Sequence, residues 1–143
     1  AGIAISNRTH LIFTAHSIPL SMAQASRYAQ EIQESAEAVA CSVDAPHWSI
    51  AYQSRSGNPR DPWLEPDVND AIRNVYRQGC EQIVLVPLGF VTDHMEVLYD
   101  LDTTARATAH TLGIPYLRAS TVACHHHFIS MLGQLVTQML QGD

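Results

Sequence analysis

The chain has 143 residues, of which 46% are hydrophobic and 15% are charged; this balance is typical of a globular domain with a real core and excludes a disordered chain. Its formal net charge is −6, and its eight Lys and Arg residues are scattered along the sequence, which argues against the basic stripe of a nucleic-acid-binding protein. The sequence has no run of about 18 apolar residues, so we expect no membrane-spanning helix.

The first ten residues and the cysteines indicate whether the chain is secreted and in which compartment it folds. Residues 1–10 lack a charged segment followed by an apolar one, so we do not expect them to be a signal peptide. Because the chain begins with Ala and reaches an apolar run almost at once, we expect it to be a piece of a longer polypeptide. Cys41, Cys80 and Cys124 lie far apart without a CxxC pair. This pattern predicts small, partly buried cysteines without disulfides, and a reducing, cytoplasmic location.

Short apolar runs alternate with longer segments whose apolar residues have helical spacing. In chain order the predicted elements are a strand at 10–15, a helix at 21–41, a strand at 48–53, a loop at 54–66, a helix capped at 67 and running to about 78, a strand at 82–87, a helix at 93–112, a strand at 114–119 and a helix at 126–141. Asp67 is the expected N-cap of the second helix, and Gly79 and Gly113 are expected to end the second and third helices.

The strict alternation of strands and helices predicts an α/β fold, with a four-stranded parallel sheet, helices on both faces and right-handed crossovers. We expect residues 1–143 to form a single domain of this kind, similar to one flavodoxin-like half. No GxGxxG or Walker A pattern follows a predicted strand, which disfavours nucleotide binding.

The carboxyl ends of parallel strands lie at one edge of a sheet, and open α/β sheets bind their ligands outside that edge. The residues that follow the predicted strands are His16 after the first, Ser54 and Arg55 after the second, Phe90, His94 and Glu96 after the third, and residues 121–125 after the fourth. We therefore expect side chains that are distant in the sequence to converge on one rim.

His16, Glu96 and Asp100 are the strongest candidates for chemistry on this rim. A neutral imidazole can bind a borderline divalent metal ion or accept a proton near neutral pH. Glu96 and Asp100 are four residues apart and therefore share one face of the predicted helix, where neighbouring like charges tend to raise the pKa of one carboxyl. This combination favours a proton relay or a path for a cation.

Each of these residues also has a structural interpretation. His16 could be a loop residue whose ring bonds the backbone, and Glu96 and Asp100 could form a solvated acidic turn that suits the helix dipole. Asp93 could be the N-cap of the third helix, with Glu96 at the N3 position of a capping box.

Two further segments are candidates for binding. The loop at 53–66 contains Arg55, Arg60 and Trp63, which could hold a flat anionic ligand by stacking and charge, or belong to an ordinary surface loop. Three histidines stand in a row at 125–127. Consecutive side chains on a helix point in different directions, so a polar helix start is favoured there over a single metal site.

Four collinear segments carry a resemblance to a known family. They are FTAHSIP (13–19), YQSRSG (52–57), PWLEP (62–66) and VPLGFVTDHMEVLYDLD (86–102). With them, residues 11 to about 140 resemble the C-terminal half of a ferrochelatase. The wording AHSIPLSMAQAS and DHMEVLYDLDTTARATA is most similar to the actinobacterial branch, which is associated with coproporphyrin metallation.

The resemblance implies a reaction and a partner. Ferrochelatases have two similar α/β domains with the porphyrin in the cleft between them, so this chain would need an N-terminal domain to complete the site. The implied reaction is that of a lyase in haem biosynthesis, in which Fe²⁺, as a substrate, enters coproporphyrin III and two protons leave. This chemistry needs a base with a pKa near neutrality, nearby acids and a cleft that fixes the ring.

The resemblance also implies roles for single residues. His16 matches a metal ligand or proton acceptor, Glu96 its partner carboxylate, and Asp100 the next member of an acidic line that carries metal ions or protons. The remaining matches are Trp63, Phe90, Asp93 and His94, which line the porphyrin pocket, and Ser54 and Arg55, which lie in a motif beside the cleft.

The chain departs from the family in three places. Thr104 stands where many members have Glu, and residues 125–128 replace an Asp-Pro-x-Phe segment. The cysteines do not match the [2Fe–2S] pattern of some actinobacterial members, so we expect no cluster in this chain. The alternative interpretation is a stand-alone half-domain that binds a divalent metal ion or a porphyrin without turnover, dimeric like the small cobalt chelatases of the same superfamily.

Overall fold

The computed structural model describes residues 5–58 and 60–142; our expectations for the first ten residues lie partly outside this range. The strands are β1 (Thr9–His16), β2 (Trp48–Gln53), β3 (Gln82–Val86) and β4 (Tyr116–Arg118). The helices are α1 (Leu20–Gln24), α2 (Tyr28–Ser42), α3 (Val68–Arg77), α4 (Met95–Val97), the π-helical segment η1 (Leu98–Ala105), α5 (Arg106–Leu112) and α6 (His126–Gln141).

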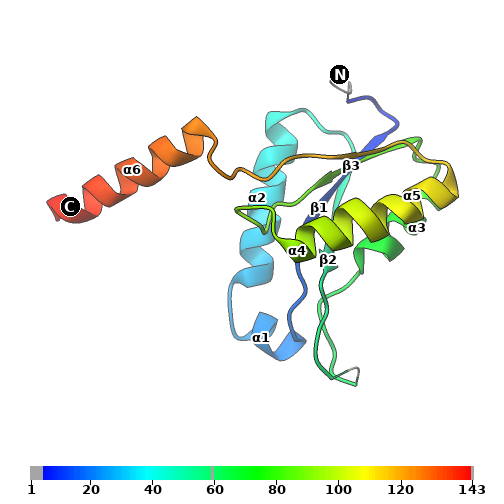
Figure 1. The fold of residues 1–143 in the computed structure, drawn as a ribbon, viewed down its shortest axis with the longest axis horizontal. Coiled ribbons are helices and arrows are strands. Elements are labelled where there is room, and N and C mark those ends of the chain that lie inside the picture. Colours follow the sequence, from blue (N-terminus) through cyan, green and yellow to red (C-terminus); the bar gives the residue numbers. More distant parts are fainter. Residues whose placement is uncertain (1–4, 59, 143) are drawn as a thin grey trace.

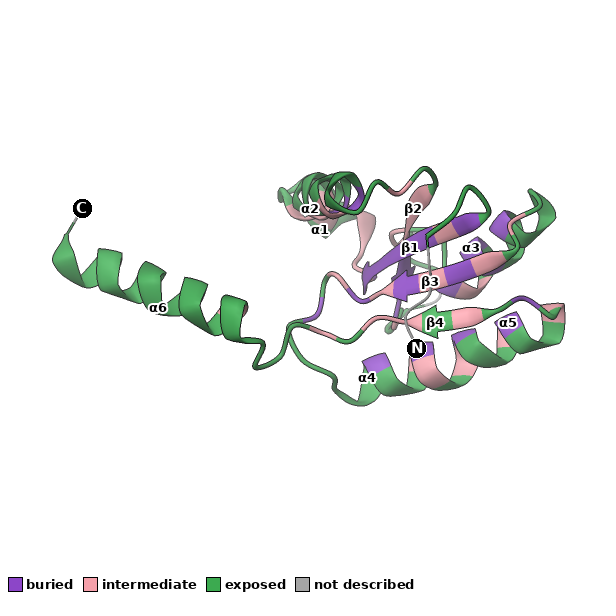
Figure 2. Cartoon of the chain, turned by 90° about the horizontal axis from the view of Figure 1, so that it is seen from above, coloured by how far each residue is buried: buried purple, intermediate pink, exposed green. Residues whose placement is uncertain are grey.

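The four strands form one sheet in the order β2-β1-β3-β4, and each neighbouring pair is parallel (Figures 1 and 2). Ile12 of the central strand β1 lies opposite Ser49 of β2 and Leu85 of β3. The predicted four-stranded parallel α/β sheet is therefore confirmed, and the carboxyl ends of β1, β2 and β3 share one edge.

Helices cover both faces of this sheet, as predicted, because alternate residues of β1 point to opposite sides. Leu11 and Phe13 pack on one face, against Ala36 and Ala40 of α2. Ile12 packs on the other face in a larger core. That core also contains Ile72 of α3, Leu85 of β3, Val97 of α4, Leu101 of η1 and Ala109 of α5. The two helical layers lie on either side of the strands in Figure 2.

Two helices differ from the predicted ones. Residues 21–41 form α1 and α2 rather than one helix, because α1 ends at Gln24 with Ala25 as its C-cap and α2 begins at Tyr28. Just beyond that cap, Ser26 Oγ donates to Met22 O. The helix predicted at 93–112 begins at Met95, and its middle, from Leu98 to Ala105, is a π-helix. Hydrophobic spacing does not distinguish a π-helical segment from an α-helix over so short a length.

The last helix and the cysteines complete the comparison. The bounds of α6 match the prediction, but α6 extends away from the sheet and has no buried residue (Figures 1 and 2). Cys80 is partly buried as expected, whereas Cys41 and Cys124 are exposed; the expectation of burial was wrong for these two because both lie on outer surfaces. Among the described residues, no helix has the length and apolar character that a membrane span needs.

The loop after β3 packs tightly on β1. Gly89 N–H donates to Thr14 O at 3.0 Å, and a Cβ at position 89 would lie 2.8 Å from the Cβ of Ala15. Only glycine allows this close approach. The loop thereby brings Phe90 and His94 to the carboxyl end of β1.

Candidate active site

His16 is the last residue of β1, and its backbone and ring are both fixed. Tyr28 Oη, from the start of α2, donates to His16 O at 2.9 Å; burial raises the pKa of Tyr28, which keeps this hydroxyl a donor. The His16 Nδ1 lies 2.5 Å from Ser17 O. A carbonyl can only accept, so Nδ1 carries the hydrogen and Nε2 of the neutral ring keeps a lone pair.

Glu96, in the first turn of α4, lies against this lone pair. Its Oε2 is 3.7 Å from His16 Nε2 and 4.0 Å from His94 Nδ1. His94 in turn packs edge-to-face on the buried Phe90, with ring centroids 5.3 Å apart. The expected convergence on one rim is therefore present for His16, Phe90, His94 and Glu96.

This group is half open to solvent. The exposed fractions of the side chains are 33% for His16, 44% for His94 and 53% for Glu96. Across the described part of the chain, no three His, Cys, Asp or Glu side chains are arranged as a ready-made metal-binding group. His16 Nε2 and a Glu96 oxygen are nevertheless a nitrogen and an oxygen donor that face each other, which suits a borderline divalent ion.

The Asp100 side chain is hydrogen-bonded to Ser54, the residue that follows β2. Ser54 Oγ donates to Asp100 Oδ2 at 2.5 Å, and the neighbouring Gln53, which is 1% exposed, points its Nε2 at Glu96 O at 3.4 Å. Ser54 has a positive φ of 61°, a costly conformation for serine. These contacts join β2 to the helix that carries Glu96, and sequence reasoning missed the part that Gln53 takes in them.

The capping box expected at Asp93 and Glu96 was wrong. His94, in an extended conformation, is the N-cap of α4 and makes no side-chain cap bond. The Asp93 carboxylate instead forms an ion pair with Arg118 at 3.1 Å, because the last residue of β4 reaches across to the loop. Arg118 was not predicted as a site residue; the signal available was an arginine at the end of the fourth predicted strand.

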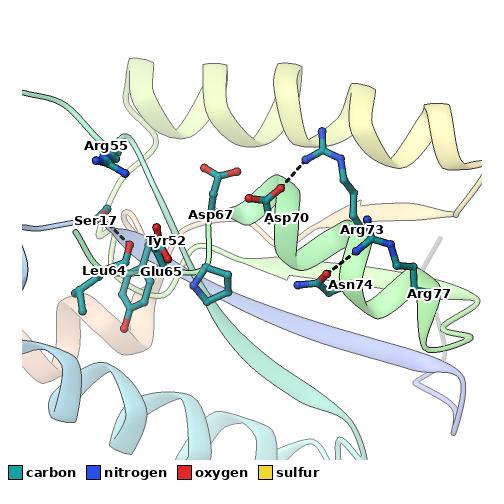
Figure 3. Close-up of a pocket in the computed structure, with 11 residues that line it drawn as sticks. Ser17, Tyr52, Arg55, Leu64, Glu65, Asp67, Asp70, Arg73, Asn74 and Arg77 are labelled. Atoms are coloured by element: carbon teal, nitrogen blue, oxygen red, sulfur yellow. Dashed lines mark hydrogen bonds and ion pairs between the residues drawn. The ribbon is translucent and has the colours of Figure 1, made fainter. Parts of the chain in front are cut away.

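The loop at 54–66 lies beside this group. Trp63 pairs through its backbone with Pro19, three residues beyond His16, and Arg55 Nη2 donates to Asp61 O within the loop at 3.0 Å. A cavity of about 700 Å³ opens here (Figure 3). Its lining includes Arg55 and the buried Ser17, but neither His16 nor Glu96 is among the described residues that line it.

The cavity has a mixed charge. The charged side chains along its wall are Arg55, Glu65, Asp67, Asp70, Arg73 and Arg77. Asp70 and Arg73 already pair with each other at 2.9 Å, and Arg77 donates to Asn74 (Figure 3). This wall has no surplus of positive charge to attract an anion.

The three histidines at 125–127 gather more closely than expected. Their ring centroids are 3.8 to 5.4 Å apart. His125 is the N-cap of α6, and His126 and His127 are its first two residues. They lie at the start of α6, a helix without a buried residue. His94, by contrast, belongs to the loop after β3.

Comparison with known proteins gives a consistent assignment. The family model described as "Ferrochelatase" matches residues 2–140. A ferrochelatase from Rhodopirellula baltica is 46% identical over 93% of this chain and 38% of its own length. A coproporphyrin III ferrochelatase from Propionibacterium freudenreichii is 42% identical over 98% of this chain and 42% of its own length.

A solved structure has a similar fold. A CbiX protein from Marinobacter aquaeolei, assigned to cobalamin (vitamin B12) biosynthesis, superposes with a TM-score of 0.68 over 94% of this chain and 99% of its own. At 18% identity this likeness concerns the fold alone. The chain spans 38% and 42% of the lengths of the two curated relatives, or about two-fifths.

Proposed function

The chain belongs to the ferrochelatase family, and from this premise we propose that it forms the C-terminal half of a metal chelatase of the lyase class. The substrates we assign are Fe²⁺ and a porphyrin, with coproporphyrin III as the preferred ring because several similar curated relatives carry that name. The remainder of the porphyrin site is assigned to an N-terminal domain, since the chain spans about two-fifths of those relatives.

One observation carries this proposal: His16 Nε2 faces Glu96 Oε2 at 3.7 Å, across the carboxyl edge of the sheet. The Nδ1 hydrogen of His16 is committed to Ser17 O, so Nε2 is the nitrogen available to a metal ion or a proton. Metal-binding histidines commonly fix their other ring nitrogen in this way.

Metallation requires that two pyrrole protons leave as the metal ion enters. In the proposed mechanism His16 Nε2 accepts the two pyrrole protons one after the other, and the Glu96 carboxylate stabilises each imidazolium by its charge. Each proton then passes from Nε2 to Glu96, which is 53% exposed and releases it to solvent. A pair of protein donors also leaves coordination positions open, which a metal ion that must be passed on to a substrate needs.

Asp100 is assigned to the delivery of the ion. It continues the acidic side of the helix one turn beyond Glu96, and the hydrogen bond from Ser54 fixes its Oδ2. We assign Trp63, Phe90, Asp93 and His94 to the wall that faces the ring. The sparse cysteines, all free in the described chain, support the further prediction of a cytoplasmic location.

The test is a metallation assay on the natural gene product that contains this chain, with coproporphyrin III and either anaerobic Fe²⁺ or Zn²⁺. Loss of the free-porphyrin absorbance gives the rate. We expect His16→Ala to lower kcat by about 10²- to 10⁴-fold, the usual contribution of a positioned general base. Glu96→Gln should lower it by at least about tenfold, because the neutral amide no longer stabilises the imidazolium.

Matched controls are His110→Ala and Glu34→Gln, which remove an exposed histidine of α5 and an exposed carboxylate of α2. Both should keep wild-type rates. Wild-type turnover in His16→Ala would remove that residue from the mechanism. Tight binding of porphyrin or Zn²⁺ by a wild-type protein that shows no turnover would favour the alternative, a binding half-domain without catalysis.

A further inference from the structure

We propose that Arg118, at the end of β4, is a positioning residue that holds the loop of Asp93 and His94 against the sheet, so that His94 and Glu96 face His16. The catalytic consequence of this clamp rests on the proposed function, whereas the clamp itself is a property of the fold. Among the hydrogen bonds of the described chain, Arg118 is bonded to neither His94 nor Glu96, and it acts on them through Asp93 and Asp102.

All five N–H donors of the Arg118 guanidinium have an acceptor. Nε donates to Asp102 Oδ1 at 2.9 Å, and Nη2 donates to Asp102 Oδ2 at 2.8 Å. Nη1 and Nη2 donate to the two oxygens of Asp93, each at 3.1 Å. The remaining donor of Nη1 reaches Ala119 O at 3.3 Å. Because every N–H donor of the planar guanidinium is bonded, the group is held in one orientation.

Burial makes these bonds more consequential than surface ion pairs. The Arg118 side chain is 12% exposed, against 34% for Asp93 and 25% for Asp102. The hydrogen bonds that Arg118 donates hold the pKa of Asp102 below its usual range. The same bonds, accepted by Asp102 and Asp93, raise the pKa of Arg118. A partly buried, doubly bidentate pair resists the solvent screening that weakens exposed salt bridges.

The clamp joins three pieces of chain that meet at the site. Arg118 ends β4, which is fixed to the sheet because Ala119 N donates to Leu85 O. Asp93 directly precedes His94, the N-cap of α4, and Asp102 lies in η1. The Arg118 side chain therefore connects the sheet to Asp93, just before the helix that carries Glu96, and to Asp102, nine residues after Asp93.

A backbone contact supports the same loop. Ala123 N, in the segment after β4, donates to Val91 O at 2.8 Å. The beginning of the loop is fixed by the close approach of Gly89 to Ala15, and His94 packs on Phe90. The Asp93 ion pair adds a charged contact between Val91 and His94.

Arginine is required for this role because it is a planar fork. Lysine would supply the charge and three donors, but it cannot bind two carboxylates bidentately at once. Arg106 is the matched comparison: it also pairs with Asp102, at 3.2 Å, but it is 57% exposed and is not bonded to Asp93 in the described structure.

The first measurement is amide hydrogen exchange in Arg118→Gln, Arg118→Lys and Arg106→Gln, on the natural gene product that contains this chain. We expect faster exchange at residues 91–98 in both Arg118 variants and no such increase in Arg106→Gln. Unchanged exchange in Arg118→Gln would overturn the clamp, whether or not the protein metallates porphyrin. Asp93→Asn, which keeps the Asp102 pair, gives the same readout should Arg118→Gln fail to fold.

The second measurement is steady-state metallation of coproporphyrin III by the same variants. We expect Arg118→Gln to lower kcat by about 10- to 100-fold, as a misplacement of catalytic groups by about 1 Å does, with the KM for porphyrin nearly unchanged. Arg118→Lys should recover little of kcat. Wild-type kcat in Arg118→Gln, or full rescue by lysine, would overturn the positioning role. Absence of turnover in the wild type would count against the proposed function and leave the exchange result to decide the clamp.

Discussion

At the scale of single residues, the chemistry of His16 depends on one backbone carbonyl. Ser17 O accepts from Nδ1 and so determines which ring nitrogen has a free lone pair. A second imidazole in the same strand is treated in the opposite way. His10 Nε2 is 2.9 Å from Ser49 Oγ, and burial, with a smaller contribution from His47, lowers the pKa of His10 to about 4. The fold therefore keeps His10 neutral and structural.

His10 predicts how the stability of the fold varies with pH. Its pKa is about 4 in the folded chain and about 6.5 when unfolded, so between these values the unfolded state binds more protons. The free energy of unfolding should therefore fall as the pH drops from about 6.5 toward 4, by about 1 kcal/mol from this partly exposed group. In urea titrations, the difference in the free energy of unfolding between pH 7 and pH 5 should be smaller for His10→Gln than for the wild type. An equal difference in the variant would contradict this role of His10.

At the scale of elements, the helix from Met95 to Leu112 gives the clearest contrast between sequence and structure. Its extent was nearly predictable from apolar spacing, and its end at Gly113 follows from a φ of 70° that glycine adopts readily. Its start was not predictable. Asp93 looked like a cap, but a bidentate arginine from β4 competes better for its carboxylate than backbone N–H groups do, and Arg118 is distant in the sequence.

The topology explains why the central pair was predictable. Four alternating strands and helices leave a parallel sheet as the natural arrangement, so residues at the ends of β1 and β3 had to share an edge. That argument located His16 and Glu96 without any side-chain detail. The contacts of Gln53, Ser54 and Arg118 depend instead on long-range side-chain packing, which local sequence patterns do not encode.

The loop after β3 makes a prediction at this scale. In Gly89→Ala the new Cβ would lie 2.8 Å from the Cβ of Ala15, so the loop must shift, at a cost of about 1–3 kcal/mol. Denaturant titration should show this loss, and metallation should slow because His94 and Glu96 follow the loop. Gly133→Ala is the control, since nothing in the described chain lies within 4 Å of a Cβ there. Wild-type stability in Gly89→Ala would contradict the close approach.

At the scale of the whole molecule, α6 is separate from the body of the fold. Most of its apolar side chains are exposed, with Met139 and Leu140 more than 80% exposed, and residues 126–142 contain no Asp, Glu, Lys or Arg. α6 therefore buries no residue against the sheet or its helices in the described chain. The sheet and its two helical layers therefore account for the stability of the fold.

Deleting residues 126–143 tests that division. Thermal unfolding can be followed by the fluorescence of Trp48 and Trp63, which both lie outside α6. The free energy of unfolding should change by less than about 1 kcal/mol, as expected for the loss of exposed side chains, so the midpoint temperature should shift little. The far-ultraviolet circular dichroism should lose helical signal. A large fall in the midpoint would show that α6 packs on the body in solution.

The central claim is that His16 and Glu96 act together on one metal ion and its displaced protons. A double-mutant cycle tests it most directly, by comparing kcat for His16→Ala, Glu96→Gln and the double variant in the same metallation assay. Residues that act as a unit are strongly non-additive, so we predict that the double variant is about as slow as the slower single variant. Multiplication of the two single losses in the double variant would contradict the claim.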